Sequence, residues 1–174
     1  MQIPFILPNR LLPKSINLCD LGKRPLAFQS DRDMRPVKET KRASVHVGYD
    51  GRVHKRFLGP FAELRYQNEV RTLRYLQNKG CPFVPRLIQE DPKKLYIVTS
   101  NCGTIVESIS DERLRALFEE LESFGVRHDD PFARNVTYNR HLGRFCIIDF
   151  EFATTLETGE GLTSADLERL QKGT

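Results

Sequence analysis

The sequence predicts an α+β fold, because short runs with strand-like alternation are interspersed with longer segments of helical periodicity. Residues 43–57 alternate apolar and polar side chains around Tyr49-Asp50-Gly51, and an Asp-Gly pair between two such runs is a strong hairpin signal. Residues 61–79 carry apolar side chains at helical spacing and end at Gly80, a residue suited to the position after a helix. An antiparallel hairpin followed by a helix is therefore expected.

The same signals predict the elements that follow. Further strands are expected over residues 84–88, 94–99, 135–138 and 145–148, a second helix over residues 111–125 and a short third helix over residues 163–172. The first two helices should turn apolar stripes toward the core, formed by Leu64, Val70, Leu73 and Leu76 and by Leu114, Leu117, Phe118 and Leu121. Asp111 is the expected N-cap of the second helix, and Thr163 to Asp166 provide the cap of the third.

Composition is typical of one globular domain with a single core. Of the 174 residues, 39% are hydrophobic and 29% charged, and the mean hydropathy is −0.46. No membrane span is expected, and a net charge of +4 without interleaved aromatics does not predict nucleic-acid binding. The four Cys residues lie too far apart for a zinc motif and are expected to be reduced. The start of the chain lacks a signal-peptide pattern, so a cytoplasmic location is expected.

The segment 125–152 carries the strongest chemical signal. Asp130 and Asn135 lie five residues apart in a loop that contains Pro131, and Asp149 follows an apolar run that is typical of a buried strand. Mg²⁺ prefers hard oxygen ligands and usually takes one or two carboxylates from the protein, with phosphates and water completing its shell. Asp149 and Asn135 are suitable ligands, which leaves Asp130 to accept a proton from an attacking hydroxyl.

The run His128-Asp129-Asp130-Pro131-Phe132-Ala133-Arg134-Asn135 resembles the H-x-D-x-x-x-x-N catalytic loop of the protein-kinase-like superfamily. Asp149-Phe150-Glu151 then falls where that superfamily has its metal-binding D-F-G motif, with Glu151 in place of Gly. The ordered pair of motifs is more specific than either alone. The resemblance implies ATP and Mg²⁺ as cofactors, Asp130 as the catalytic acid–base residue, and Asn135 and Asp149 as metal ligands.

The resemblance also assigns residues upstream. Lys55 resembles the phosphate-binding lysine of the superfamily, and Glu69 resembles the helix glutamate that pairs with it. A Lys between apolar neighbours on one strand face needs a partner, because an unpaired buried charge is costly. From the residues alone, Lys55 could instead be exposed on an edge strand, Glu69 could be an ordinary partner of an Arg on its helix, and Glu63 competes for the same role.

For the nucleotide itself, the resemblance points to a hinge after the strand predicted to end at Thr99. Backbone groups of Ser100, Asn101 and Cys102 would there meet the adenine edge. The sequence has no G-x-G-x-x-G phosphate loop, and Ser44 is the candidate phosphate contact in its place.

The resemblance covers residues 40–153 and implies a protein-kinase-like two-lobe fold. It divides the chain into a proline-containing N-terminal arm (1–38), an N-lobe with an antiparallel sheet and one helix (39–99), and a hinge with a minimal, truncated C-lobe (100–174). The platform that normally binds a peptide substrate would be missing from this C-lobe.

Three functions from different classes remain open. The first is an ATP- and Mg²⁺-dependent phosphotransferase, with a serine/threonine protein-kinase-like activity favoured over a small-molecule kinase that acts on a sugar or an amino alcohol. Its partners would be ATP and an unidentified hydroxyl-bearing protein or small molecule. The second is a pseudokinase-type binding module, favoured by the absent glycine loop. The third is a non-enzymatic α+β domain whose acids only cap loops.

Overall fold

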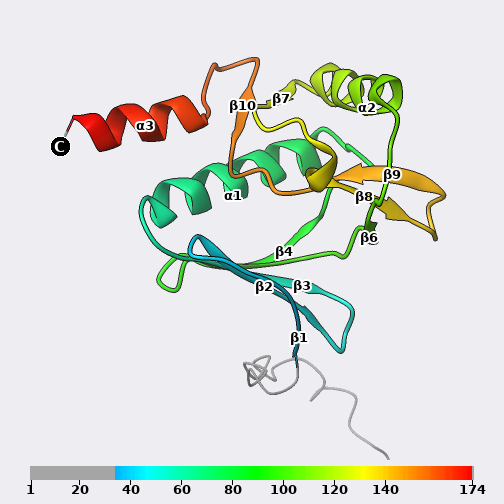
Figure 1. Ribbon diagram of the computed structural model, residues 1–174, viewed down its shortest axis with the longest axis horizontal. Coiled ribbons are helices and arrows are strands. Elements are labelled where there is room, and N and C mark those ends of the chain that lie inside the picture. Colours follow the sequence, from blue (N-terminus) through cyan, green and yellow to red (C-terminus); the bar gives the residue numbers. More distant parts are fainter. Residues whose placement is uncertain (1–33, 174) are drawn as a thin grey trace, which may run out of the picture. The chain divides into compact units, whose positions relative to one another are not determined.

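The computed structural model describes residues 34–173 and shows a mixed α+β fold (Figure 1). Its strands are β1 (Met34–Glu39), β2 (Ala43–Gly48), β3 (Val53–Phe57), β4 (Leu87–Asp91), β5 (Tyr96–Thr99), β6 (Thr104–Ile105), β7 (Val126–His128), β8 (Val136–Asn139), β9 (Arg144–Ile147) and β10 (Ala153–Thr155). Its helices are α1 (Ala62–Asn78), α2 (Asp111–Ser123) and α3 (Ser164–Lys172), with a 3-10 turn at Ala133–Asn135.

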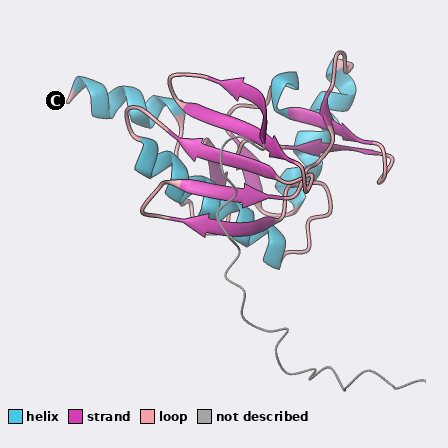
Figure 2. Ribbon diagram, turned by 90° about the horizontal axis from the view of Figure 1, so that it is seen from below, coloured by secondary structure: helices cyan, strands magenta, loops and turns pink. Residues whose placement is uncertain are grey.

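The first sheet has five antiparallel strands in the order β1-β2-β3-β5-β4 (Figure 2). The predicted hairpin forms its β2 and β3, joined by a turn in which Gly51 has the positive φ of 74° that an Asp-Gly pair favours. β1 begins at Met34, so the sheet starts before the arm boundary predicted at residue 38. The remainder of the predicted arm, residues 1–33, lies outside the described residues.

Helix α1 packs between this sheet and the chain around β10 (Figure 1). Leu73 and Leu76 are completely buried, and Tyr66 meets the Phe57 ring of β3 edge-on with centroids 5.6 Å apart. The prediction that Leu64 faces the core is wrong, because the residue is 40% exposed. Tyr66 occupies the core position next to β3 instead.

The remaining strands form two small sheets. β6, β8 and β9 make a three-stranded antiparallel sheet, and β7 pairs with β10. Helix α2 buries Leu117 and Leu121, as predicted, with Leu114 and Phe118 partly buried against the same core. Its N-cap is Ser110 rather than Asp111, since the Ser110 hydroxyl accepts the Arg113 N–H.

One strand lies later in the chain than predicted. Residues 84–88 were expected to form a strand, but β4 begins only at Leu87. Pro85 has no N–H for a ladder, and Phe83 and Val84 are buried in the core.

The predicted capping box of α3 is confirmed, with Thr163 and Asp166 bonded reciprocally. Within residues 34–173, no helix has the length and apolar character needed to cross a membrane.

Candidate active site

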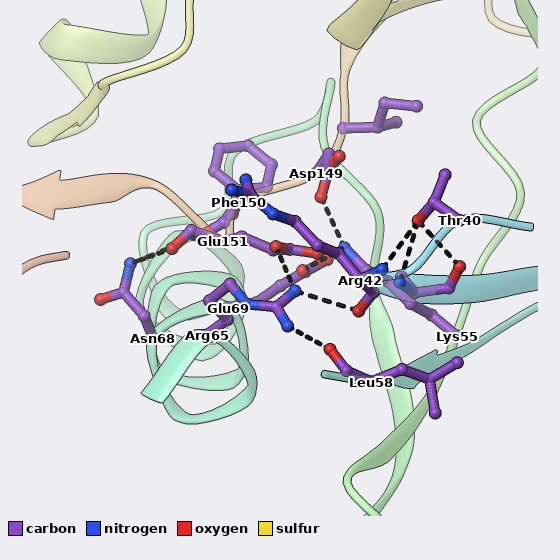
Figure 3. A network of polar contacts seen from close by, with 12 residues as sticks. Thr40, Arg42, Lys55, Leu58, Arg65, Asn68, Glu69, Asp149, Phe150 and Glu151 are labelled. Atoms are coloured by element: carbon purple, nitrogen blue, oxygen red, sulfur yellow. Dashed lines mark hydrogen bonds and ion pairs between the residues drawn. The ribbon is translucent and has the colours of Figure 1, made fainter. Parts of the chain in front are cut away.

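Lys55 lies on β3, a strand flanked by β2 and β5, and its side chain is turned toward α1. It is buried, with 7% of its surface exposed, and it is surrounded by three carboxylates (Figure 3). Its Nζ lies 2.6 Å from Glu69 Oε2 on α1, 2.5 Å from Asp149 Oδ1 and 2.9 Å from Glu151 Oε1. Segments from three parts of the sequence therefore converge on one ammonium group.

Two side chains of this cluster, Lys55 and Glu69, have raised pKa values. Burial alone would lower the pKa of Lys55, but the carboxylates of Asp149, Glu69 and Glu151 outweigh it and hold the pKa well above its ordinary value. Burial raises the pKa of Glu69 to about 8, against the opposing influence of Lys55. The two shifts have different main causes: the neighbouring acids raise the pKa of Lys55, whereas burial raises that of Glu69, with Asp149 and Glu151 adding to it. The three carboxylates thus favour the charged form of the Lys55 ammonium.

Asp149 follows β9 and has a φ of 67°, in the left-handed region that non-glycine residues rarely adopt. In this conformation the carboxylate of Asp149 reaches Lys55. Backbone strain of this kind persists only where surrounding structure holds it, and it is found most often at functional sites.

Asp130 and Asn135 form the second half of the site. The Asn135 amide nitrogen donates to both the backbone oxygen and Oδ2 of Asp130, each at 2.8 Å. Arg134 makes an ion pair with the other carboxylate oxygen of Asp130. The backbone N–H of Ile148 donates to the Asn135 carbonyl at 2.9 Å, so Asn135 lies beside the residue that precedes Asp149.

His128 is hydrogen-bonded to the loop that carries Asp130. Its Nδ1 accepts the backbone N–H of Asp130 at 3.1 Å, so Nε2 carries the proton and donates to the Ile148 carbonyl at 3.2 Å. The ring also packs against Phe118 and Phe150. Burial lowers the pKa of His128 and thus favours this neutral form. The histidine thereby links the loop of Asp130 to the strand end that carries Asp149.

The oxygen donors fit a hard divalent cation. Both hydrogen bonds of the Asn135 side chain to Asp130 use its amide nitrogen, which leaves the carboxamide oxygen as the atom available to a metal. One ligand oxygen from each of Glu69, Asp149 and Glu151 lies within 4.8 Å of the others. The Lys55 ammonium lies among these three carboxylates, and a metal-binding role for Asp149 and Asn135 stays a prediction.

Ser44 is not brought to this cluster. It pairs with Arg56 across β2 and β3, whereas Lys55 pairs with Val45, so Ser44 lies on the opposite face of the sheet from Lys55. Its hydroxyl contacts Nδ1 of His46. The predicted phosphate contact through the Ser44 side chain is therefore not supported by its position.

The predicted hinge residues follow β5 and lead into β6. The Ser100 N–H donates to the Arg86 carbonyl, and the Ser100 hydroxyl accepts the Arg86 N–H. Asn101 Oδ1 accepts the N–H of Gly103, and the Cys102 carbonyl accepts the Thr137 hydroxyl. These contacts fix the course of the segment that joins the first sheet to the three-stranded sheet. An adenine contact at this segment stays a prediction.

Of the two glutamates that competed for Lys55, Glu69 is the one that contacts it, while Glu63 is exposed and accepts a hydrogen bond from Gln67. Three residues of the network were missed as site residues: Arg65, Asn68 and Glu151. A signal for the first two was present. Arg65, Asn68, Glu69 and Thr72 recur at helical spacing and are all buried, which marks a polar stripe on the inner face of α1.

No protein-family profile and no curated protein sequence matches this chain. Among solved structures, it is similar to a Rio2 kinase of Chaetomium thermophilum, crystallised as an ADP/Mg²⁺-phosphoaspartate complex, with a TM-score of 0.50 and 19% sequence identity. The match covers 71% of this chain and 48% of that one, so the chain spans about half the length of the kinase. At this identity the likeness concerns the fold alone, and the mixed α+β arrangement is compatible with a kinase-like N-lobe, while the division into two lobes stays a prediction.

Proposed function

We propose that this protein is an ATP- and Mg²⁺-dependent phosphotransferase that acts on a hydroxyl group. The observation that carries the proposal is the convergence of two carboxylates on the Lys55 ammonium of β3. Glu69 of α1 and Asp149, which follows β9, each place an oxygen within 2.6 Å of Lys55 Nζ. Acids that merely cap loops have no reason to meet at one buried ammonium. The kinase-like fold supports the same conclusion.

Each residue then has a distinct role. Lys55 binds the nucleotide phosphates and Glu69 orients it, while Asn135 and Asp149 offer oxygen ligands to the metal. Mg²⁺, when bound, would neutralise phosphate charge that Lys55 cannot balance alone. The oxygen of the acceptor hydroxyl bonds to the γ-phosphorus while the bond between the γ-phosphorus and the bridging oxygen breaks and ADP leaves. Asp130 accepts the proton that the hydroxyl loses.

For the acceptor, we favour a Ser or Thr side chain of a protein over a sugar or an amino alcohol. The order of the motifs along the chain resembles that of compact serine/threonine-kinase-like proteins, and this resemblance supports the choice. After Asp149 the chain returns at once through β10 to pair with β7, so the acceptor would meet an open loop around Asp130. Ser100 to Cys102 are proposed to bind the adenine through backbone groups.

The direct test is phosphate transfer from radiolabelled ATP with Mg²⁺, offered in parallel to generic protein substrates and to sugar and amino-alcohol acceptors. Incorporation into protein supports the favoured acceptor, and incorporation into small molecules selects the alternative. The Asp130→Asn variant is the matched control. Labelling by the wild-type protein that does not exceed labelling by this control would contradict the proposed activity and favour a binding module.

A further inference from the structure

Arg65 is a completely buried arginine on α1, four residues before Glu69. Its guanidinium donates to Glu151 Oε2 at 2.9 Å, and to the backbone oxygens of Arg42 at 3.1 Å, Leu58 at 2.5 Å and Pro60 at 3.3 Å. A buried charge is costly unless it is paired and hydrogen-bonded. These contacts meet that requirement at both terminal nitrogens of Arg65, while its Nε has no hydrogen-bond partner among the described residues. Arg65 therefore ties the β1–β2 turn, the end of β3 and the segment after Asp149 to one helix.

Glu151 connects this arginine to the site. One of its carboxylate oxygens contacts Arg65 and the other lies 2.9 Å from Lys55 Nζ (Figure 3). Without Arg65, the three carboxylates around Lys55 would face a single cation. With it, the cluster holds two cations, and Glu151 is held between them. A glycine at position 151, as in the D-F-G motif, has no side chain to make this link.

Asn68 holds the same segment through its backbone. Its amide nitrogen lies 3.0 Å from the carbonyl oxygens of both Glu151 and Ala153. On the other side, the N–H of Asp129 donates to the Phe152 carbonyl at 2.9 Å, and the Thr154 hydroxyl donates to Asp129 Oδ2 at 2.7 Å. The chain after Asp149 is thus fixed both to α1 and to the strand that leads into the Asp130 loop.

We propose that the Arg65–Glu151 pair is a positioning pair that keeps Lys55, Glu69 and Asp149 assembled before any ligand binds. The proposal rests on the proposed function for its consequence, nucleotide affinity. That the pair holds the segment after Asp149 in place follows from the contacts of Arg65 and Asn68 on α1 and does not depend on the proposed function. Neither residue needs to touch the nucleotide, because each acts through Lys55 or through the backbone around Asp149.

The test compares Arg65→Met with Arg74→Met, a matched control on the same helix whose ion pair with Glu90 is exposed. Amide hydrogen exchange is measured without ligand, and Mg-ADP affinity by calorimetric titration. In Arg65→Met we expect exchange over residues 58–62 and 149–155 to accelerate about tenfold, with a similar loss of affinity, since contacting buried pairs couple at this scale. Exchange in α2 and both properties of Arg74→Met should match wild type.

Glu151→Gln provides a second test if Arg65→Met does not fold, because it preserves shape while removing the charge. It should reproduce the local acceleration. Unchanged exchange in a folded variant would overturn the proposal, and so would faster exchange with unchanged Mg-ADP affinity. If wild type binds no Mg-ADP, the proposed function fails, and the exchange data alone then decide whether the pair holds the segment.

Discussion

Glu69 Oε2 lies 2.6 Å from Lys55 Nζ, and the two residues stand fourteen positions apart on α1 and β3. The contact joins a helix to a strand of the first sheet at a point where both side chains are almost completely buried. It gives Lys55 the partner that its burial requires. The position of α1 against the sheet therefore determines the position of the ammonium group.

Replacement of Lys55 by Met should abolish phosphotransfer and also destabilise the fold. The change leaves three carboxylates facing only Arg65, and removal of one partner from a buried ion pair costs about 3–5 kcal/mol. Urea unfolding measures the loss of stability, and the labelling assay measures the loss of activity. Lys94→Met, which removes an exposed pair with Asp91, is the control and should change stability by less than about 1 kcal/mol. Equal stability of the two variants would refute the buried cluster.

Replacement of Asp130 by Asn should separate binding from chemistry. Asn is nearly the same size and can still bond to Asn135, but it cannot accept the acceptor's proton. We expect kcat to fall about 10²–10⁴-fold with little change in the affinity for Mg-ADP. Single-turnover kinetics combined with calorimetry would show this. Full turnover in the variant would exclude Asp130 as the proton acceptor.

The stability of the protein should decrease as the pH falls below 6.5, and His128 should contribute to this. Burial lowers its folded pKa, so its contribution is complete above the ordinary value of 6.5 and is lost as the pH drops toward the folded pKa. The limit is about 1.4 kcal/mol per pH unit for one proton. Protonated Nδ1 could also no longer accept the N–H of Asp130.

His128→Phe isolates this contribution, because Phe preserves ring packing and cannot be protonated. Chemical unfolding of both proteins between pH 5 and pH 8 should show a steeper decline for the wild type below pH 6.5. The comparison is needed because burial also lowers the pKa of His54. Parallel curves would contradict a buried, neutral His128.

Elements with local signals were predictable. The hairpin of β2 and β3, the helices α1 and α2 and the capping box of α3 each follow from residues close together in the chain. The start of β4 was missed because burial of Phe83 and Val84 is a tertiary preference that overrides their strand propensity. Ser110 and Asp111 can both cap a helix, and only the backbone geometry decides between them.

In the candidate site, too, residues that belong to sequence motifs were predictable, whereas contacts that depend on tertiary packing were not. Motif spacing placed Lys55, Glu69 and Asp149 in one predicted cluster, and these residues do converge. The Arg65–Glu151 pair spans 86 positions, and such a pairing leaves no local trace beyond the polar stripe of α1. Ser44 was chosen for its place near the expected phosphate loop, and position along the chain does not reveal which face of the sheet a side chain occupies.

Thermal unfolding with and without Mg-ATP tests most directly whether Asp149 and Lys55 form a Mg-nucleotide site, as we propose. At a ligand concentration of about 100 times Kd, binding contributes about 2.7 kcal/mol, which should raise the Tm of the wild type by about 5–10 °C. Asp149→Ala should show no shift, with Mg²⁺ or without it. A wild-type Tm that does not move with Mg-ATP, or an equal rise in Asp149→Ala, would contradict the claim.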